Sequence, residues 1–111
     1  MPVLGVLQSF PDGAATPARF HDGRRERSIL VVRRGTELRA YEDSCPHQYL
    51  PLTYRGAQVL SEDGERLRCS SHGAEFAVED GRALSGPGNG SALTKVPVRV
   101  TPDGNVMVES G

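Results

Sequence analysis

The chain has 111 residues, of which 13 are basic and 14 acidic, giving a formal net charge of −1. This length fits one domain over residues 1–111, without room for a nucleotide-binding domain beside a catalytic one. The balanced charge provides no basic field for a nucleic acid or an anionic membrane, so we expect neither as a partner. No apolar stretch approaches the roughly 18 residues of a membrane span, and the start MPVLGVLQSF lacks the basic residues of a signal peptide, so we expect a cytoplasmic protein.

Four β-hairpins are predicted along the chain, each made of two short β-rich runs around a turn. The paired runs are 28–33 with 36–41, 58–60 with 66–68, 76–78 with 82–84, and 96–100 with 105–108. Three of the turns place a glycine directly after an aspartate, which favours a turn because glycine tolerates a positive φ. We expect irregular structure over 12–22, 42–57 and 85–91. Strand pairs at this spacing, without sustained helical periodicity, predict an all-β antiparallel sandwich or small barrel.

Two short segments contain the residue types that bind soft and borderline metals. The first is Cys45-Pro46-His47, and the second runs from Cys69 to His72-Gly73. The predicted hairpin between them returns the chain close to its start, so the two segments can meet at one metal site. A structural zinc site is one alternative, although zinc sites commonly pair cysteine with cysteine and histidine with histidine along the chain.

The spacing C-x-H, a hairpin, and then C-x-x-H resembles the Rieske [2Fe–2S] family. Cys45, His47, Cys69 and His72 fill the four ligand positions of its motif. The resemblance runs from about residue 29 to 108 and includes further matching residues. These are Pro51, Leu52, Gly73, Phe76, Gly81 and the proline loop Gly86-Pro87-Gly88.

The resemblance implies an antiparallel Rieske-type sandwich with a small rubredoxin-like cluster-binding subdomain over about residues 43–90. One [2Fe–2S] cluster is the implied cofactor, with Cys45 and Cys69 on one iron and His47 and His72 on the other. The two histidines are expected nearest to solvent.

In functional terms the chain looks like the soluble ferredoxin of a ring-hydroxylating dioxygenase system. Such a protein carries single electrons from a flavin-dependent reductase to a terminal oxygenase or another redox acceptor, works as a monomer and is not itself an enzyme. We therefore expect no catalytic residues. One alternative is a small Rieske subunit of a larger reductase, similar to that of a nitrite reductase. A structural zinc-binding module is the other.

The resemblance also predicts a low reduction potential. High-potential members carry an extra cysteine in each ligand loop, whereas this chain has Leu50 and Ser71 at those positions. They also carry a serine that donates to a cluster sulfide, where this chain has Ala74. Fewer donors to sulfur stabilise the reduced state less, which places the expected potential near roughly −150 mV.

Several other polar side chains have ordinary structural interpretations. We expect His21 to be a surface histidine in a turn and Tyr49 to be a packing ring. Glu42 and Asp43 precede the first ligand segment, where they either steer a redox partner or serve as ordinary acidic loop residues. A basic cluster, expected to be a solvated hairpin face, consists of Arg24, Arg25, Arg27, Arg33 and Arg34.

Overall fold

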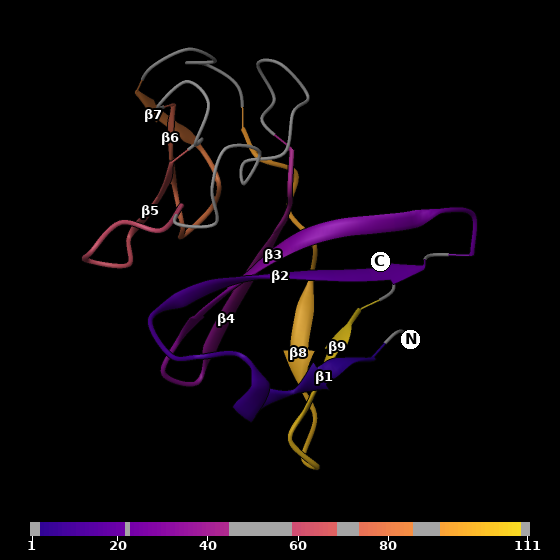
Figure 1. Cartoon of the computed structure of the whole chain (residues 1–111). Coiled ribbons are helices and arrows are strands. Elements are labelled where there is room, and N and C mark those ends of the chain that lie inside the picture. Colours follow the sequence, from indigo (N-terminus) through magenta and orange to yellow (C-terminus); the bar gives the residue numbers. More distant parts are fainter. Residues whose placement is uncertain (1–2, 22, 45–58, 69–73, 86–91, 110–111) are drawn as a thin grey trace.

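Short strands separated by glycine turns form three antiparallel sheets (Figure 1). The computed structural model describes residues 3–21, 23–44, 59–68, 74–85 and 92–109. Within these ranges the elements are β1 (Val3–Val6), the 3₁₀ turn η1 (Leu7–Ser9), β2 (Ala14–His21), β3 (Glu26–Arg34), β4 (Glu37–Glu42), β5 (Arg66–Arg68), β6 (Glu75–Ala77), β7 (Ala83–Ser85), β8 (Val98–Val100) and β9 (Asn105–Val108). None of the described residues belongs to a helix long and apolar enough to cross a bilayer.

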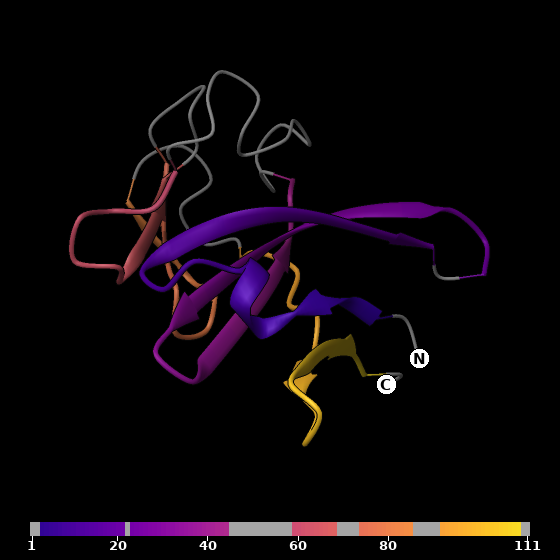
Figure 2. The same cartoon turned by 60° about the horizontal axis from the view of Figure 1, so that its bottom comes forward.

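The three sheets are named here by their positions. The outer sheet has the strand order β1-β9-β8, the central sheet β2-β3-β4, and the small sheet β5-β6-β7. Figures 1 and 2 show the outer and small sheets on different sides of the central sheet. The expectation of an all-β, antiparallel fold is confirmed.

The four predicted hairpins are present. β3 pairs with β4 around Gly35, and β8 pairs with β9. β6 pairs with β7, and a bridge between Leu60 and Leu67 joins the two arms of the second hairpin. Gly64, Gly81 and Gly104, the glycines that follow aspartates, have φ values of 73°, 80° and 84°. Each therefore adopts the left-handed conformation for which the Asp-Gly pattern was interpreted as a turn signal.

The expectation of irregular structure over 12–22 is wrong, because Ala14–His21 form β2. β2 pairs along its whole length with β3, from Ala14 opposite Arg33 to His21 opposite Glu26. Pro17 and the small alanines gave this segment a weak intrinsic preference for a strand. β2 is an edge strand, where a proline is tolerated, and the long apolar β3 beside it determines its conformation.

Residues 29–32 form a continuous apolar run because β3 is buried on both of its faces. Side chains alternate along a strand, so Leu30 and Val32 enter one core while Ile29 and Val31 enter a second. The first core lies against the small sheet and also contains Tyr41, Val59, Leu67, Ala74, Phe76, Val78 and Leu93. The second core lies against the outer sheet and also contains Phe10, Phe20, Ala40, Val96, Val106 and Val108. The central sheet thus joins the two halves of the molecule.

The five arginines predicted to form one basic cluster are separated by the length of β3. Arg24, Arg25 and Arg27 lie at or before the start of this nine-residue strand, and Arg33 and Arg34 end it. At about 3.3 Å per residue the two groups are roughly 20 Å or more apart. The prediction of a single cluster is wrong, because an extended strand separates residues that are close in sequence.

Candidate metal centre

The four predicted ligands, Cys45, His47, Cys69 and His72, lie outside the described residues. The same holds for Tyr49, Leu50, Ser71 and the proline loop at 86–88. The described chain bounds the three segments that contain them, which are 45–58, 69–73 and 86–91. Within the described chain itself, no group of three or more His, Cys, Asp or Glu side chains forms a candidate metal site.

The residues that border the second ligand segment lie at neighbouring ends of β5 and β6 in the small sheet. Arg68, the residue before Cys69, is the register partner of Glu75 in the antiparallel pair β5–β6. Glu75 is in turn paired with Ser85, the last residue of β7. The chain therefore enters segment 69–73, leaves it, and enters segment 86–91 at adjacent strand ends.

The first ligand segment ends next to the point where the second one begins. The backbone N–H of Arg68 donates to the carbonyl of Val59 over 2.7 Å. Val59 is the first described residue after segment 45–58, and Arg68 is the last before Cys69. One backbone hydrogen bond thus joins the C-terminal side of the first segment to the N-terminal side of the second.

The start of the first ligand segment is held by the end of β4. The N–H of Glu42 donates to the carbonyl of Thr94 over 2.8 Å, and that of Asp43 donates to Ser28 over 3.0 Å. The neighbouring Leu93 N–H donates to Gly81, in the turn between β6 and β7, over 2.9 Å. The chain that leads to Cys45 is therefore connected, through residues 93–94, to the β6–β7 hairpin.

The described residues at and beside these strand ends include a buried apolar floor of four side chains. Val59, Leu67, Ala74 and Phe76 are at most 1% exposed and belong to one core cluster. Apart from the phenol of Tyr41, no polar or charged side chain is buried among the described residues. Buried apolar side chains of this kind lower the dielectric of their immediate surroundings.

Two predicted polar residues have local partners. His21 is exposed at the end of β2, and its Nδ1 accepts the N–H of Gly23 over 3.1 Å, as expected for a surface histidine near a turn. Glu42 forms an ion pair with Arg27, whose guanidinium lies 5.5 Å from the centre of the Phe20 ring. The carboxylate of Glu42 therefore has an intramolecular partner, the guanidinium of Arg27.

Tyr41 supports the candidate site although the sequence indicates only a strand residue at this position. Its side chain is fully buried, and its hydroxyl donates to the carbonyl of Val78 over 2.5 Å. The available signal was a tyrosine in a run of alternating strand residues four positions before Cys45. A buried tyrosine hydroxyl needs a partner, but sequence alone does not identify a backbone carbonyl 37 residues away.

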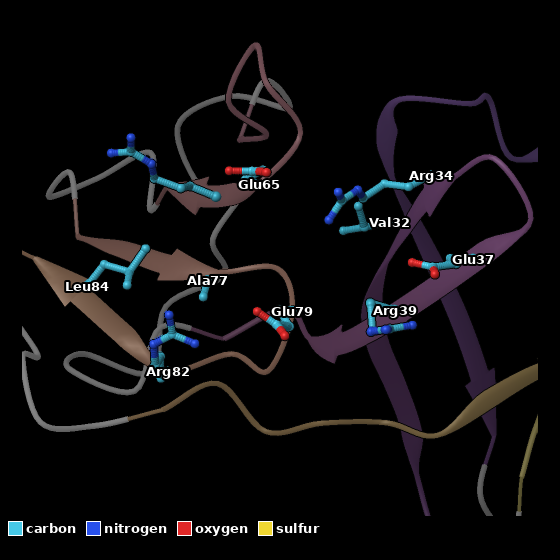
Figure 3. A pocket seen from close by; sticks show the side chains of 10 residues that line it. Val32, Arg34, Glu37, Arg39, Glu65, Ala77, Glu79, Arg82 and Leu84 are labelled. Carbon is cyan, nitrogen blue, oxygen red and sulfur yellow. The ribbon is translucent and has the colours of Figure 1, made fainter.

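A charged cleft of about 460 Å³ separates β3 and β4 from the small sheet (Figure 3). One wall carries Arg34, Glu37 and Arg39, and the other carries Glu65, Arg66, Glu79 and Arg82. Basic and acidic groups alternate on both walls, so the lining favours neither an anion nor a cation.

Two comparisons by sequence bear on the identity of the fold. A family model described as the Rieske [2Fe-2S] domain matches residues 6–102. The ferredoxin component of the alkene monooxygenase system of Xanthobacter autotrophicus (strain ATCC BAA-1158 / Py2) is 34% identical over 83 residues, or 75% of this chain. The matched part is 62% of that relative, so the chain spans less than two thirds of its length.

Solved structures show the same architecture. The ferredoxin of carbazole 1,9a-dioxygenase from Nocardioides aromaticivorans IC177 is 22% identical, with 99% of this chain and 97% of that chain covered and a TM-score of 0.78. A chain in the structure described as a complex of reduced oxygenase and oxidized ferredoxin in carbazole 1,9a-dioxygenase is 26% identical, with 96% of this chain and 90% of that chain covered and a TM-score of 0.74.

These matches confirm the predicted Rieske-type fold. The family match covers most of the chain and begins at residue 6, further toward the N-terminus than the resemblance seen in the sequence. One Rieske-type [2Fe–2S] cluster is the cofactor that goes with this domain. The chain belongs to the Rieske [2Fe–2S] domain family.

Proposed function

We propose that this chain is a Rieske ferredoxin that carries single electrons from a flavin-dependent reductase to a terminal oxygenase. Cys45 and Cys69 would hold one iron of the cluster, and His47 and His72 the other. The observation that carries the proposal is the hydrogen bond from Arg68 to Val59, which joins two described residues that border the ligand-bearing segments.

The donor set fits this cofactor. The chain contains two cysteines and three histidines, so an all-thiolate cluster would lack two ligands. His21 lies on β2 and accepts a hydrogen bond from Gly23, which leaves His47 and His72 for the centre. Two thiolates and two neutral imidazoles give the oxidised centre a formal charge near zero, which favours uptake of one electron.

The cluster supplies one-electron redox chemistry when bound, and the protein supplies its surroundings. The buried floor formed by Val59, Leu67, Ala74 and Phe76 excludes water from the strand ends. The backbone bonds of Arg68 and Glu42 hold the chain on either side of the ligand segments. We assign no catalytic residue, because the proposed role is transfer of electrons to another protein.

Several finer features belong to the same proposal. We propose residues 1–111 as one domain with its cluster-binding part at about 43–90, and we propose that it works as a monomer. A terminal oxygenase as acceptor is supported by the 26% identical chain, whose structure is described as a complex of oxygenase and ferredoxin. The cytoplasm is the proposed compartment, because both cysteines are assigned as ligands and none is left for the disulfides of oxidising compartments.

The test begins with electron paramagnetic resonance of protein purified without air and reduced with dithionite. A Rieske centre gives an average g below that of the free electron, together with equal amounts of iron and labile sulfide. Cys69→Ser should abolish the signal, whereas the control His21→Ala should retain it. A colourless protein that contains zinc and no sulfide would establish the structural zinc module instead.

A second experiment separates a mobile carrier from a fixed subunit. A flavin-dependent ferredoxin reductase with NADH should reduce cytochrome c faster when the loaded protein is added, because the carrier links the two. The protein should also run as a monomer in size-exclusion chromatography. Co-purification with a large reductase, together with no stimulation of cytochrome c reduction, would favour the subunit role.

A further inference from the structure

We propose that Tyr41 is a positioning residue that fixes, relative to one another, the described stretches of chain that border segments 45–58, 69–73 and 86–91. This inference rests on the proposed function. It follows from one juxtaposition: the Tyr41 side chain lies where the end of β4, the β6–β7 turn and residues 92–94 meet.

The hydroxyl provides the first link. It donates to the carbonyl of Val78, which follows β6 and is fully buried. The N–H of Val78 donates to the carbonyl of Glu65 over 2.9 Å, so this residue is also bonded to the chain just before β5. Through Val78, the Tyr41 hydroxyl holds the base of the hairpin that bounds segment 69–73.

The ring provides the second link. A Cβ on Gly81 would lie 2.8 Å from Cε1 of Tyr41 and 3.3 Å from Cβ of Leu93. The ring therefore packs directly on the glycine backbone in the turn that leads into β7. The N–H of Leu93 donates to the carbonyl of Gly81. This hydrogen bond connects the glycine beneath the ring to the described chain that follows segment 86–91.

The backbone of Tyr41 provides the third link. Tyr41 pairs with Leu30 in the central sheet and forms an isolated bridge with Lys95. It stands four residues before Cys45, and the intervening Glu42 and Asp43 are bonded to Thr94 and Ser28. The backbone of Tyr41 thus holds the described chain that leads to the first ligand segment, while its side chain contacts the described chain that borders the other two.

The hydroxyl is the part of this arrangement that can be removed without disturbing the packing. Burial raises the pKa of Tyr41 to about 12, so the hydroxyl keeps its proton at neutral pH and can donate a hydrogen bond. Phenylalanine keeps the ring against Gly81 but leaves the buried Val78 carbonyl without its donor. A buried carbonyl without a partner moves to find one, and this would change the position of the chain that bounds the ligand segments.

The test compares loaded Tyr41→Phe with loaded wild type and with Val106→Ala. Val106 is fully buried in the second core, on β9, so its truncation lowers stability without touching the supports of the ligand segments. We expect Tyr41→Phe to broaden the electron paramagnetic resonance signal and to release iron to a chelator roughly tenfold faster. Tenfold is the factor that corresponds to the loss of about one buried hydrogen bond. Val106→Ala should keep the wild-type line shape even where it is less stable.

Amide hydrogen exchange provides a readout that does not depend on the cluster. The N–H groups of Gly81 and Leu93 are bonded within the proposed support, to Ala77 and Gly81, and should lose protection in Tyr41→Phe beyond any global loss. Unchanged line shape and exchange in Tyr41→Phe would overturn the inference and leave Tyr41 as an ordinary core residue. A wild type without a Rieske signal would defeat the proposed function, while the exchange comparison would still test the link between the segments.

Discussion

Gly81 and Tyr41 are packed so closely that any side chain on the glycine would overlap the tyrosine ring. An added Cβ would lie 2.8 Å from Cε1 of Tyr41, and the backbone at Gly81 has a φ of +80°. We therefore expect Gly81→Ala to lower the free energy of unfolding by about 2–4 kcal/mol, from backbone strain and overlap together. Urea denaturation followed by circular dichroism measures this loss.

Gly104 provides the matched control for this prediction. Its φ of +84° is nearly the same, but an added Cβ would meet nothing within 4 Å. Gly104→Ala should therefore lower the free energy of unfolding by about 1 kcal/mol, from backbone strain alone. Equal losses in the two variants would mean that contact with Tyr41 contributes nothing at Gly81.

The buried phenol of Tyr41 predicts a loss of stability at high pH. Its pKa is about 12 in the folded protein against 10.0 for an ordinary tyrosine, and the cause is desolvation by burial. Below pH 10 the phenol is neutral in the folded and the unfolded state, so its contribution to the free energy of unfolding is fully present. Between pH 10 and 12 the unfolded chain ionises first, and the folded state loses up to roughly 3 kcal/mol.

Urea denaturation at pH 9 and pH 11 can isolate this effect when wild type and Tyr41→Phe are measured side by side. Over this interval the wild type should lose about 1 kcal/mol more than the variant, since the variant has no phenol at this position. Parallel losses in the two proteins would assign the alkaline sensitivity to other groups.

The ion pair between Arg27 and Glu42 should be stronger than a typical surface pair. The two side chains are 25% and 27% exposed, and the guanidinium also lies over the Phe20 ring. A double-mutant cycle with Arg27→Met and Glu42→Gln should give a coupling free energy of about 1–2 kcal/mol.

The pair Arg19–Glu26, between β2 and β3, is the control for that cycle. Its side chains are 71% and 61% exposed at a separation of 3.3 Å, so its coupling should stay below about 0.5 kcal/mol. A coupling for Arg27 and Glu42 as small as this would show that partial burial adds nothing to the pair.

The sequence predicted the hairpins well because their signals are local. Gly64, Gly81 and Gly104 follow aspartates, and turn chemistry of this kind acts within a few residues. β2 was not predicted, because its strand conformation comes from pairing with β3, which is a tertiary effect. The same limit explains the division of the arginine cluster, since the span of β3 separates residues that are close in sequence.

The candidate centre shows the same contrast between local and distant information. Residue types and spacing alone selected Cys45, His47, Cys69 and His72, and the family match supports the cofactor they imply. The supports of their segments depend on contacts between distant parts of the chain. The bond from Tyr41 to Val78 spans 37 positions, and no pattern within one strand indicates it.

Ala74 offers a direct test of the predicted low potential. It is fully buried and directly follows the second ligand segment, at the position where the family resemblance places a serine in high-potential members. A hydroxyl that donates to a cluster sulfide stabilises the reduced state, because that state carries the additional negative charge. If the hydrogen bond is worth about 1 kcal/mol more in the reduced state, Ala74→Ser raises the midpoint potential by roughly 40 mV from a wild-type value of about −150 mV.

A redox titration followed by circular dichroism measures that shift, and Ala77→Ser is its control. Ala77 is also buried, on β6, but it pairs with Arg66 instead of bordering a ligand segment. A new hydroxyl there should leave the potential unchanged, since it lies three residues further from the ligands along the chain. Equal shifts in the two variants would mean that any added polar group changes the potential, and a wild-type potential in the high positive range would refute the low-potential assignment itself.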